Sequence, residues 1–325
     1  MIPFSVLDVV PLRRGSTATV ALRESIALAK HVETLGYQRY WFAEHHGMQG
    51  IASSSPAVLI GQVAAATTKL RVGSGGVMLP NHAPLVIAEQ FGTLEALFPG
   101  RIDLGIGRAP GTDGKTARAL RRSTTLDAED FPQQLAEIFD HFRGTSGVTA
   151  VPCAGNEPPV WLLGSSGFSA QLAGVLGLPF AFAHHFSQEN TLPALALYRQ
   201  RFRPSPKLER PHAMVAASVL IADTDEQAMR LALPNALAFL RIRQGETGMY
   251  PSLEEAEAYP WSPPERAFAE EWMSKNVVGS PVSAKKQLDA LIASTQADEL
   301  MVLCTAPDPV ARQRSYTLLR ELYPL

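Results

Sequence analysis

Residues 159–185 read PVWLLGSSGFSAQLAGVLGLPFAFAHH, and this stretch decides the fold class. An apolar run ends at Gly164, a turn of small polar residues follows, and a helical pattern then leads into a second apolar run. A strand, a helix and a strand in this order predict a βαβ unit with parallel strands. The first amides of the helix lack partners and lie at the positive end of its dipole, so they predict an anion site beside Ser165, Ser166 and Ser169. The residues alone leave a second interpretation equally open, in which Ser166 is an ordinary N-cap.

The same alternation of strand and helix repeats along the whole chain. The expected strands cover residues 4–10, 40–43, 70–77, 102–106, 160–163, 180–183, 214–221 and 300–304, and a helical pattern follows each. The first helix is expected to end at Gly36, and the last unit to begin with Ser280 as N-cap and Pro281 at its first position. Eight such units predict an α/β protein with a (β/α)8 (TIM) barrel.

Two segments interrupt this alternation of strands and helices. Residues 144–158 are rich in turn-forming residues, and residues 244–276 form a polar stretch rich in Pro and Glu. We interpret both as insertions into a single domain that covers residues 1–325. A loop as long as the second insertion in a compact domain is commonly functional, and we expect it to form a mobile lid over the mouth of the barrel.

Composition and charge exclude several classes of partner. The 325 residues are 46% hydrophobic, and 29 basic residues against 31 acidic ones give a formal charge of −2. This balance argues against nucleic acid and against an anionic membrane surface, and short basic clusters such as Arg121-Arg122 are interpreted as a solvated face. Cys153 and Cys304 have no metal-binding spacing, and no signal peptide or spanning segment is recognised. We therefore expect a cytoplasmic protein.

Chemically useful residues cluster where the expected strands end. In a (β/α)8 barrel the active site is built at the carboxyl ends of the strands. The clusters, taken strand by strand, are Asp8, Glu44-His45-His46, Gly75-Gly76, Gly107-Arg108, the serine turn at 164–169 and His184-His185. Each cluster alone is a weak signal, but six of them at six strand ends predict one composite site.

Other common catalytic motifs fit the chain poorly. The run VGSGG at 72–76 is followed by VMLP rather than by a helix, and GIGRAPG at 105–111 places Pro110 where a dinucleotide fingerprint has its third glycine. The chain has no HExxH sequence, and adjacent histidines on a strand point to opposite faces, so no metal site is expected. No GxSxG elbow of a serine hydrolase is present.

A resemblance to a known family is carried by three segments: Glu44-His45-His46, the run LRVGSGGVMLPNHAPLVIAEQFGTLEALFPGRIDLGIGR at 70–108, and SSGFSAQLAGVLGLP at 165–179. Together they resemble the bacterial luciferase-like flavin-dependent monooxygenases, over Ile2 to about Arg320, and are most similar to the YhbW-like subgroup. The resemblance implies a barrel that takes reduced FMN from a separate NAD(P)H-dependent flavin reductase and uses O2 to oxygenate a small-molecule substrate. A homo-oligomer is expected.

The resemblance also implies roles for individual residues. His45 matches the family's catalytic histidine, and Gly75 and Gly76 match a non-prolyl cis peptide beneath the flavin ring. Cofactor-binding residues implied in this way are Gly75, Gly76, Arg108, Gly164, Ser165, Ser166 and Ser169, where Ser165 replaces a carboxylate found in luciferase. Candidates for the substrate pocket are Asp8, His46 and His185.

Two alternatives stay open on the sequence. Deazaflavin-dependent relatives on the same barrel transfer hydride without O2, and the reduced flavin that the pure protein retains would discriminate between the two cofactors. A non-catalytic flavin-binding protein is the other alternative, although related proteins of that kind have lost parts of the barrel. This chain keeps all eight expected units and His45.

Overall fold

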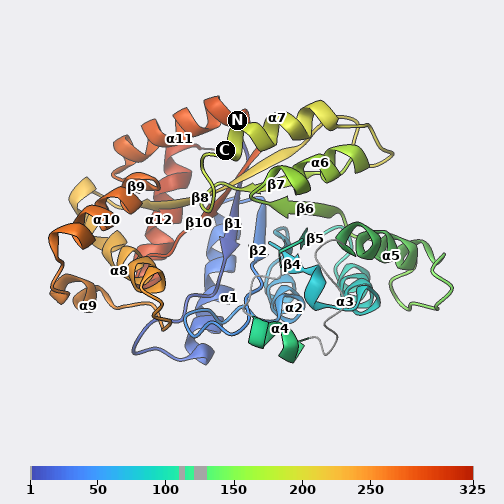
Figure 1. Ribbon diagram of the computed structural model, residues 1–325, viewed down its shortest axis with the longest axis horizontal. Coiled ribbons are helices and arrows are strands. Elements are labelled where there is room, and N and C mark those ends of the chain that lie inside the picture. Colours follow the sequence, from blue (N-terminus) through green and yellow to red (C-terminus); the bar gives the residue numbers. More distant parts are fainter. Residues whose placement is uncertain (1, 110–113, 121–129, 325) are drawn as a thin grey trace. The chain divides into compact units, whose positions relative to one another are not determined.

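Strands and helices alternate along the chain in the computed structural model, which describes residues 2–109, 114–120 and 130–324 (Figure 1). The elements are β1 (Phe4–Asp8), α1 (Ala18–Thr34), β2 (Arg39–Phe42), α2 (Pro56–Ala66), β3 (Arg71–Ser74), β4 (Val77–Met78), the 3-10 turn η1 (Leu79–Asn81), α3 (Pro84–Leu97), β5 (Ile102–Gly107), α4 (Gly114–Leu120), α5 (Phe131–Arg143), β6 (Val160–Gly164), α6 (Gly167–Leu176), β7 (Phe180–Ala183), α7 (Thr191–Arg201), β8 (Ala213–Ile221), α8 (Asp225–Arg243), α9 (Leu253–Ala258), α10 (Pro263–Ser274), β9 (Val277–Gly279), α11 (Pro281–Thr295), β10 (Glu299–Leu303) and α12 (Pro309–Leu322).

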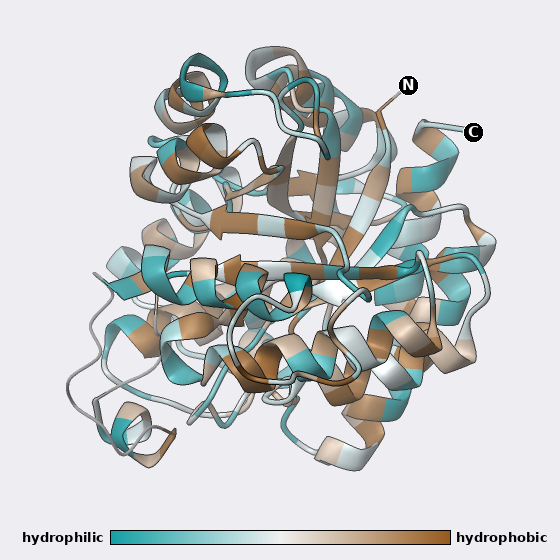
Figure 2. Cartoon of the chain, turned by 90° about the vertical axis from the view of Figure 1, so that its right-hand side faces the viewer, coloured by the Kyte–Doolittle hydropathy of each residue, from teal (hydrophilic) through white to brown (hydrophobic). Residues whose placement is uncertain are grey.

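The strands β1, β2, β3, β5, β6, β7, β8 and β10 supply the eight βα units that the sequence predicts. The fold is a (β/α)8 barrel of the α/β class, and this prediction is confirmed. Its strands are apolar and its helices carry both hydrophobic and hydrophilic residues, as Figure 2 shows. That pattern is expected of strands covered by amphipathic helices.

The chain divides into two compact units, one of Met1–Gln38, Met48–Ala52 and Val215–Leu325, and the other of Arg39–Gly47 and Ser53–Met214. We call them the terminal unit and the central unit. In the terminal unit β1 pairs in parallel with β10, and β8 pairs with β10 and β9. In the central unit β2, β3, β5, β6 and β7 form a parallel sheet in that order, and β4 pairs with β5. The single-domain organisation of residues 1–325 stays a prediction.

One expected strand is shorter than predicted and another is interrupted. β1 stops at Asp8 rather than at residue 10, because the Asp8 carboxylate accepts a 2.7 Å hydrogen bond from the Val10 amide and Val10 has a φ of 50°. The expected strand at 70–77 is split into β3 and β4 by a cis peptide bond between Gly75 and Gly76. The predicted cis geometry of this bond is therefore confirmed.

The insertion at 244–276 is not the irregular loop that its composition indicates. It contains α9 and α10, which pack on α8 around the buried side chains of Leu237, Leu240 and Ala256. Each helix begins at a serine followed three residues later by a glutamate, Ser252 with Glu255 and Ser262 with Glu265, and both serines cap their helices. This spacing is a helix-start signal that the sequence analysis missed. A lid function of the segment stays a prediction.

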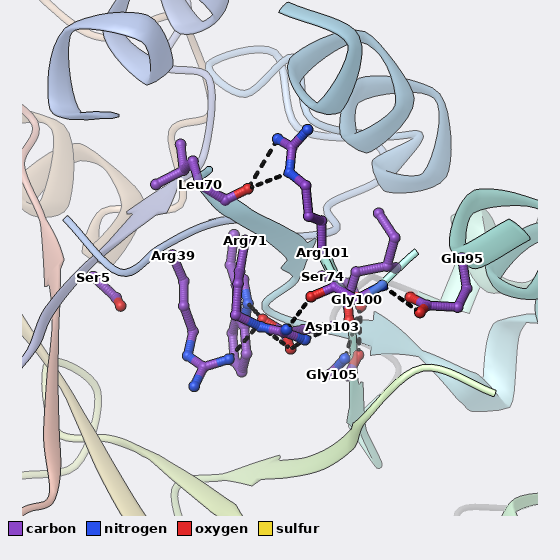
Figure 3. A network of polar contacts seen from close by, with 12 residues as sticks. Ser5, Arg39, Leu70, Arg71, Ser74, Glu95, Gly100, Arg101, Asp103 and Gly105 are labelled. Carbon is purple, nitrogen blue, oxygen red and sulfur yellow. Dashed lines mark hydrogen bonds and ion pairs between the residues drawn. The ribbon is translucent and has the colours of Figure 1, made fainter. Parts of the chain in front are cut away.

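A buried ionic network holds the amino ends of three strands of the central unit together (Figure 3). Arg39 and Arg71 lie opposite each other on β2 and β3, and the fully buried Asp103 on β5 accepts hydrogen bonds from both, at 2.9 Å from Arg39 Nη1 and 3.0 Å from Arg71 Nε. Trp41 Nε1 also donates to Asp103, at 3.1 Å. The carboxylate thus compensates two arginines that would otherwise repel each other.

No helix in the described parts of the chain combines the length and the hydropathy needed to cross a lipid bilayer.

Candidate active site

Most of the predicted site residues lie in the central unit, at the carboxyl ends of neighbouring strands. Glu44, His45 and His46 follow β2, the Gly75–Gly76 peptide follows β3, Arg108 follows β5, and the serine turn follows β6. Because β2, β3, β5 and β6 are consecutive parallel strands of one sheet, their carboxyl ends meet at one edge. This edge is where a (β/α)8 enzyme places its active site.

His45 carries a hydrogen-bonding atom without a protein partner. Its backbone amide donates to the Ser53 carbonyl at 3.2 Å, whereas its Nδ1 atom is buried and makes no hydrogen bond within the described residues. Burial lowers the pKa of His45 below its ordinary value of 6.5; the nearby Glu44 carboxylate raises it, and His46 lowers it further. His45 is therefore neutral at pH 7, with one ring nitrogen available to a ligand.

The neighbouring Glu44 is engaged on both of its oxygens. Its Oε1 atom lies 2.7 Å from Nε2 of His46 and 2.7 Å from Nε2 of His82, and its Oε2 atom accepts a 3.1 Å hydrogen bond from the Met78 amide. Burial alone would raise the pKa of Glu44, but the hydrogen bonds from His82, His46 and Met78 hold it below its ordinary value. Glu44 is thus a buried carboxylate that stays charged at neutral pH.

The cis peptide lies where two strands approach each other very closely. A Cβ atom added to Gly105 would come within 2.0 Å of the Ser74 carbonyl oxygen, and one added to Gly76 within 2.8 Å of the Gly105 carbonyl oxygen. The Ser74 hydroxyl joins the strands by donating to the Gly105 carbonyl at 2.8 Å. Close backbone packing therefore accounts for Gly73, Gly76 and Gly105, three of the glycines in VGSGG and GIGR.

The turn between β6 and α6 forms a small cradle. Ser169 is 4% exposed, and a Cβ atom at Gly164 would come within 2.8 Å of the Ser169 Cβ atom, so only glycine lets the strand end pass this close to the helix. Ser166 occupies the N-cap position of α6, yet its side chain makes no capping hydrogen bond. The N-cap interpretation of Ser166 therefore holds for its position only, and its hydroxyl is not used in capping.

Arg108 adds a positive charge at the same helix start. Its guanidinium carbon lies 4.2 Å from the ring centre of Phe168, the residue between the capping turn and Ser169. Phe168 was not among the predicted site residues, although its position beside the serines is a signal that could have been used. Helix amides, hydroxyls and a guanidinium together are the donors that a phosphate ester requires, so the residues present fit a phosphorylated cofactor.

The remaining candidates have other partners. Asp8, in the terminal unit, is fully buried and forms an ion pair with Arg312 at 2.7 Å in addition to its bond with Val10. His184 hydrogen bonds to Thr191 at 2.8 Å, and the ring of His185 lies 4.3 Å from that of Phe186. The substrate-side roles of Asp8, His46 and His185 stay predictions. Arg121 and Arg122 lie outside the described residues.

A (β/α)8 barrel with polar and charged residues gathered at the carboxyl ends of its strands is the architecture of an enzyme. The model of the luciferase-like monooxygenase family matches residues 2–299, and the chain belongs to this family. The most similar proteins include a luciferase-like monooxygenase of Escherichia coli (strain K12), 48% identical over 324 residues that cover 99% of this chain and 97% of that protein. An N-acetyl-S-alkylcysteine monooxygenase of Bacillus subtilis (strain 168) is 32% identical over 330 residues, covering 99% and 98%. The crystal structure of apo-MsnO8 superimposes with a TM-score of 0.93 at 38% identity, covering 100% and 99%.

Proposed function

We propose that this chain is the oxygenase component of a two-component system. It takes reduced FMN from a separate NAD(P)H-dependent flavin reductase and transfers one atom of O2 to a small organic substrate, while the other atom leaves as water. The observation that carries the proposal is the placement of Arg108 over Phe168 at the start of α6, next to the serine cradle. This arrangement favours a cofactor that ends in a phosphate group.

The phosphate of FMN carries nearly two negative charges at neutral pH. Arg108, the first amides of α6 and the hydroxyls of Ser166 and Ser169 would bind it by charge-assisted hydrogen bonds. At the same sheet edge, Gly75 and Gly76 present backbone without side chains, a surface suited to a flat ring. When bound, reduced flavin supplies the two electrons that the reaction with O2 consumes.

His45 is the residue best suited to move a proton in this site. It is neutral at pH 7 because burial lowers its pKa, and its Nδ1 atom has no hydrogen-bond partner within the described residues. A neutral imidazole can accept a proton at one nitrogen or donate one from the other as the reaction requires. We propose that Nδ1 makes this contact with the flavin or with the oxygen that is transferred.

A separate reductase is proposed because neither glycine-rich run, VGSGG at 72–76 or GIGRAPG at 105–111, matches the sequence fingerprint of a nicotinamide-dinucleotide site. Gly73 and Gly76 in the first run and Gly105 in the second have a packing role instead, because a Cβ atom at any of them would come within 3.0 Å of a neighbouring strand. Both cysteines are free and buried, which is consistent with the reducing cytoplasm that we propose as its compartment.

The proposal is tested by comparing flavins and then substrates. We expect the protein to bind FMN at least tenfold more tightly than riboflavin in a fluorescence titration, to prefer FMN to a deazaflavin, and to oxidise NADH negligibly by itself. Equal affinity for FMN and riboflavin would refute the phosphate site. Substrates are then screened by O2 uptake coupled to product mass, starting with N-acetyl-S-alkylcysteines because a relative is named for them. Retention of a deazaflavin with hydride transfer and no O2 uptake would refute the oxygenase role.

A further inference from the structure

We propose that Glu44 is a positioning residue for the flavin reaction, because it fastens the turn after the Gly75–Gly76 peptide to the segment that carries His45. The inference rests on the proposed function, in which His45 and this peptide face the flavin. It concerns the Glu44 triad, which we define as Glu44, His46 and His82. Neither the phosphate site nor the proton chemistry of His45 assigns a role to the contacts within this triad.

Glu44 contacts the turn η1 at both of its ends. Met78 is the N-cap of η1 and donates its amide to Glu44 Oε2 at 3.1 Å, and His82 is the C-cap residue and places its Nε2 atom 2.7 Å from Oε1. The turn begins at Leu79, only three residues after Gly76. One carboxylate therefore fixes both ends of the chain segment that leaves the cis peptide.

The same carboxylate fixes the segment that leaves β2. His46 lies 2.7 Å from Oε1, so the residues on either side of His45 in the sequence are joined to each other through their side chains. An ionised carboxylate can only accept hydrogen bonds, which requires both His46 and His82 to donate from Nε2. Glu44 thereby determines the orientation and the protonated nitrogen of both rings.

Burial makes these bonds strong and costly to replace. Glu44 is 1% exposed, whereas the side chains of His46 and His82 are 14% and 25% exposed. Hydrogen bonds to a buried charge contribute more than neutral bonds at the surface, and removing the charge leaves their donors without an acceptor. Small displacements of a reacting group are known to reduce enzymatic rates by large factors, so loosening either segment is expected to reduce the rate.

The distances favour a hydrogen-bonded triad over a metal centre, although two histidines and a carboxylate are a common ligand set. Ligand atoms bound to one zinc ion at about 2.0–2.2 Å in a tetrahedron lie about 3.3 Å apart. The two oxygen-to-nitrogen distances in the Glu44 triad are both 2.7 Å, which is the length of a charge-assisted hydrogen bond.

The test is the variant Glu44→Gln, with His82→Asn as a second, milder variant and Glu95→Gln as the control. Glu95 is a carboxylate of the same unit that accepts a backbone amide bond, from Gly100 at 2.6 Å, away from the triad. We expect Glu44→Gln to change the affinity for FMN less than threefold. The rate at which reduced FMN is oxidised with formation of product should fall at least tenfold. His82→Asn should lower this rate severalfold. The double variant of Glu44→Gln and His82→Asn should lose less rate than the product of the two single fold-changes. Glu95→Gln should behave as wild type.

A pH profile separates positioning from a general structural role. The groups that act on His45 are Glu44, whose charge raises its pKa, and His46, which lowers it, with His82 behind Glu44. Glu44→Gln should therefore move the acidic limb of the rate profile to lower pH, which a purely structural loss would not do.

Three outcomes would overturn the inference. The first is a folded Glu44→Gln variant with the wild-type rate and pH profile, while His45→Ala is impaired. If Glu44→Gln does not fold, the same result in His82→Asn counts instead. The proposed function would then stand. The second is an unimpaired His45→Ala variant, which refutes the proposed role of His45 and this inference together. The third is loss of wild-type activity in EDTA with recovery on adding zinc, which would assign the triad to a metal.

Discussion

The two ends of the parallel strands in the central unit differ in how completely their polar groups are paired. At the amino ends, Asp103 receives hydrogen bonds from Arg39, Arg71 and Trp41. At the carboxyl ends, the Nδ1 atom of His45 has no partner within the described residues, and the Ser166 side chain does not cap its helix. Paired buried groups stabilise a fold, whereas unpaired ones are retained where a ligand completes them. This sheet thus places a stabilising ionic network at the amino ends of its strands and the atoms left open to a ligand at their carboxyl ends.

The largest expected effect is at the amino ends. Asp103→Ala should lower the free energy of unfolding by about 3–5 kcal/mol, because it removes a fully buried carboxylate that pairs with two largely buried guanidinium groups. Urea denaturation measures the change. The control is Asp223→Ala, which breaks an exposed pair with Arg314 and should cost at most about 1 kcal/mol. An Asp103→Ala protein as stable as wild type would show that this network does not stabilise the amino ends of β2, β3 and β5.

At the carboxyl ends, His45→Ala should leave stability and FMN affinity nearly unchanged and lower the coupled oxidation rate about a hundredfold, the usual contribution of a proton-transfer residue. Stopped-flow mixing of reduced protein with aerated buffer measures the rate. A variant that oxidises reduced FMN and forms product like wild type would remove His45 from the mechanism.

The same residue predicts the acidic limb of the pH profile. Burial lowers the pKa of His45 below 6.5, so the folded protein binds a proton at His45 only at lower pH than the unfolded chain does. Activity should stay constant as pH falls from 7 through 6.5 and decline only below that value. His45 should also destabilise the fold as pH drops from 6.5 to its folded pKa, because the unfolded chain binds the proton first. An acidic limb centred above 6.5 would contradict this assignment.

Arg108→Ala should weaken FMN binding by about 2 kcal/mol, or roughly thirtyfold, because it removes a charge-assisted contact with the phosphate. Riboflavin affinity should not change. Arg143→Ala is the matched control, since Arg143 also lies over an aromatic ring, that of Phe139 at 5.5 Å, but on the outer helix α5. Isothermal titration of the three proteins measures the affinities, and a similar loss for both variants would exclude a specific phosphate contact.

The smallest expected effects concern the serine cradle. Ser166→Ala and Ser169→Ala should each weaken FMN binding by about 1 kcal/mol, the usual contribution of one hydrogen bond. Ser169→Ala also removes a buried hydroxyl that packs beside Gly164, so its unfolding is measured in parallel. If either variant lost as much affinity for riboflavin as for FMN, the serines would act on the flavin ring or on the fold instead of on the phosphate.

Sequence patterns located the strand ends and most of the candidate site. They predicted the positions of His45, Arg108 and the serine turn, since each directly follows an apolar run. They missed the helices of the 244–276 insertion, because its polar composition obscured two helix-start signals. They also extended the first strand to residue 10, since no local pattern shows that Asp8 captures the Val10 amide.

The sequence by itself determined the (β/α)8 fold, the membership in the luciferase-like family and which residue types stand at the strand ends. Periodicity and turn chemistry are local, so a single chain displays them. Only the tertiary structure decided that Glu44 joins His82 to His46, that Arg108 lies over Phe168, and that Asp103 compensates two arginines. Except for the contact between Glu44 and His46, these contacts join residues that are far apart along the chain. Their geometry depends on how the strands are paired and on where each side chain is packed.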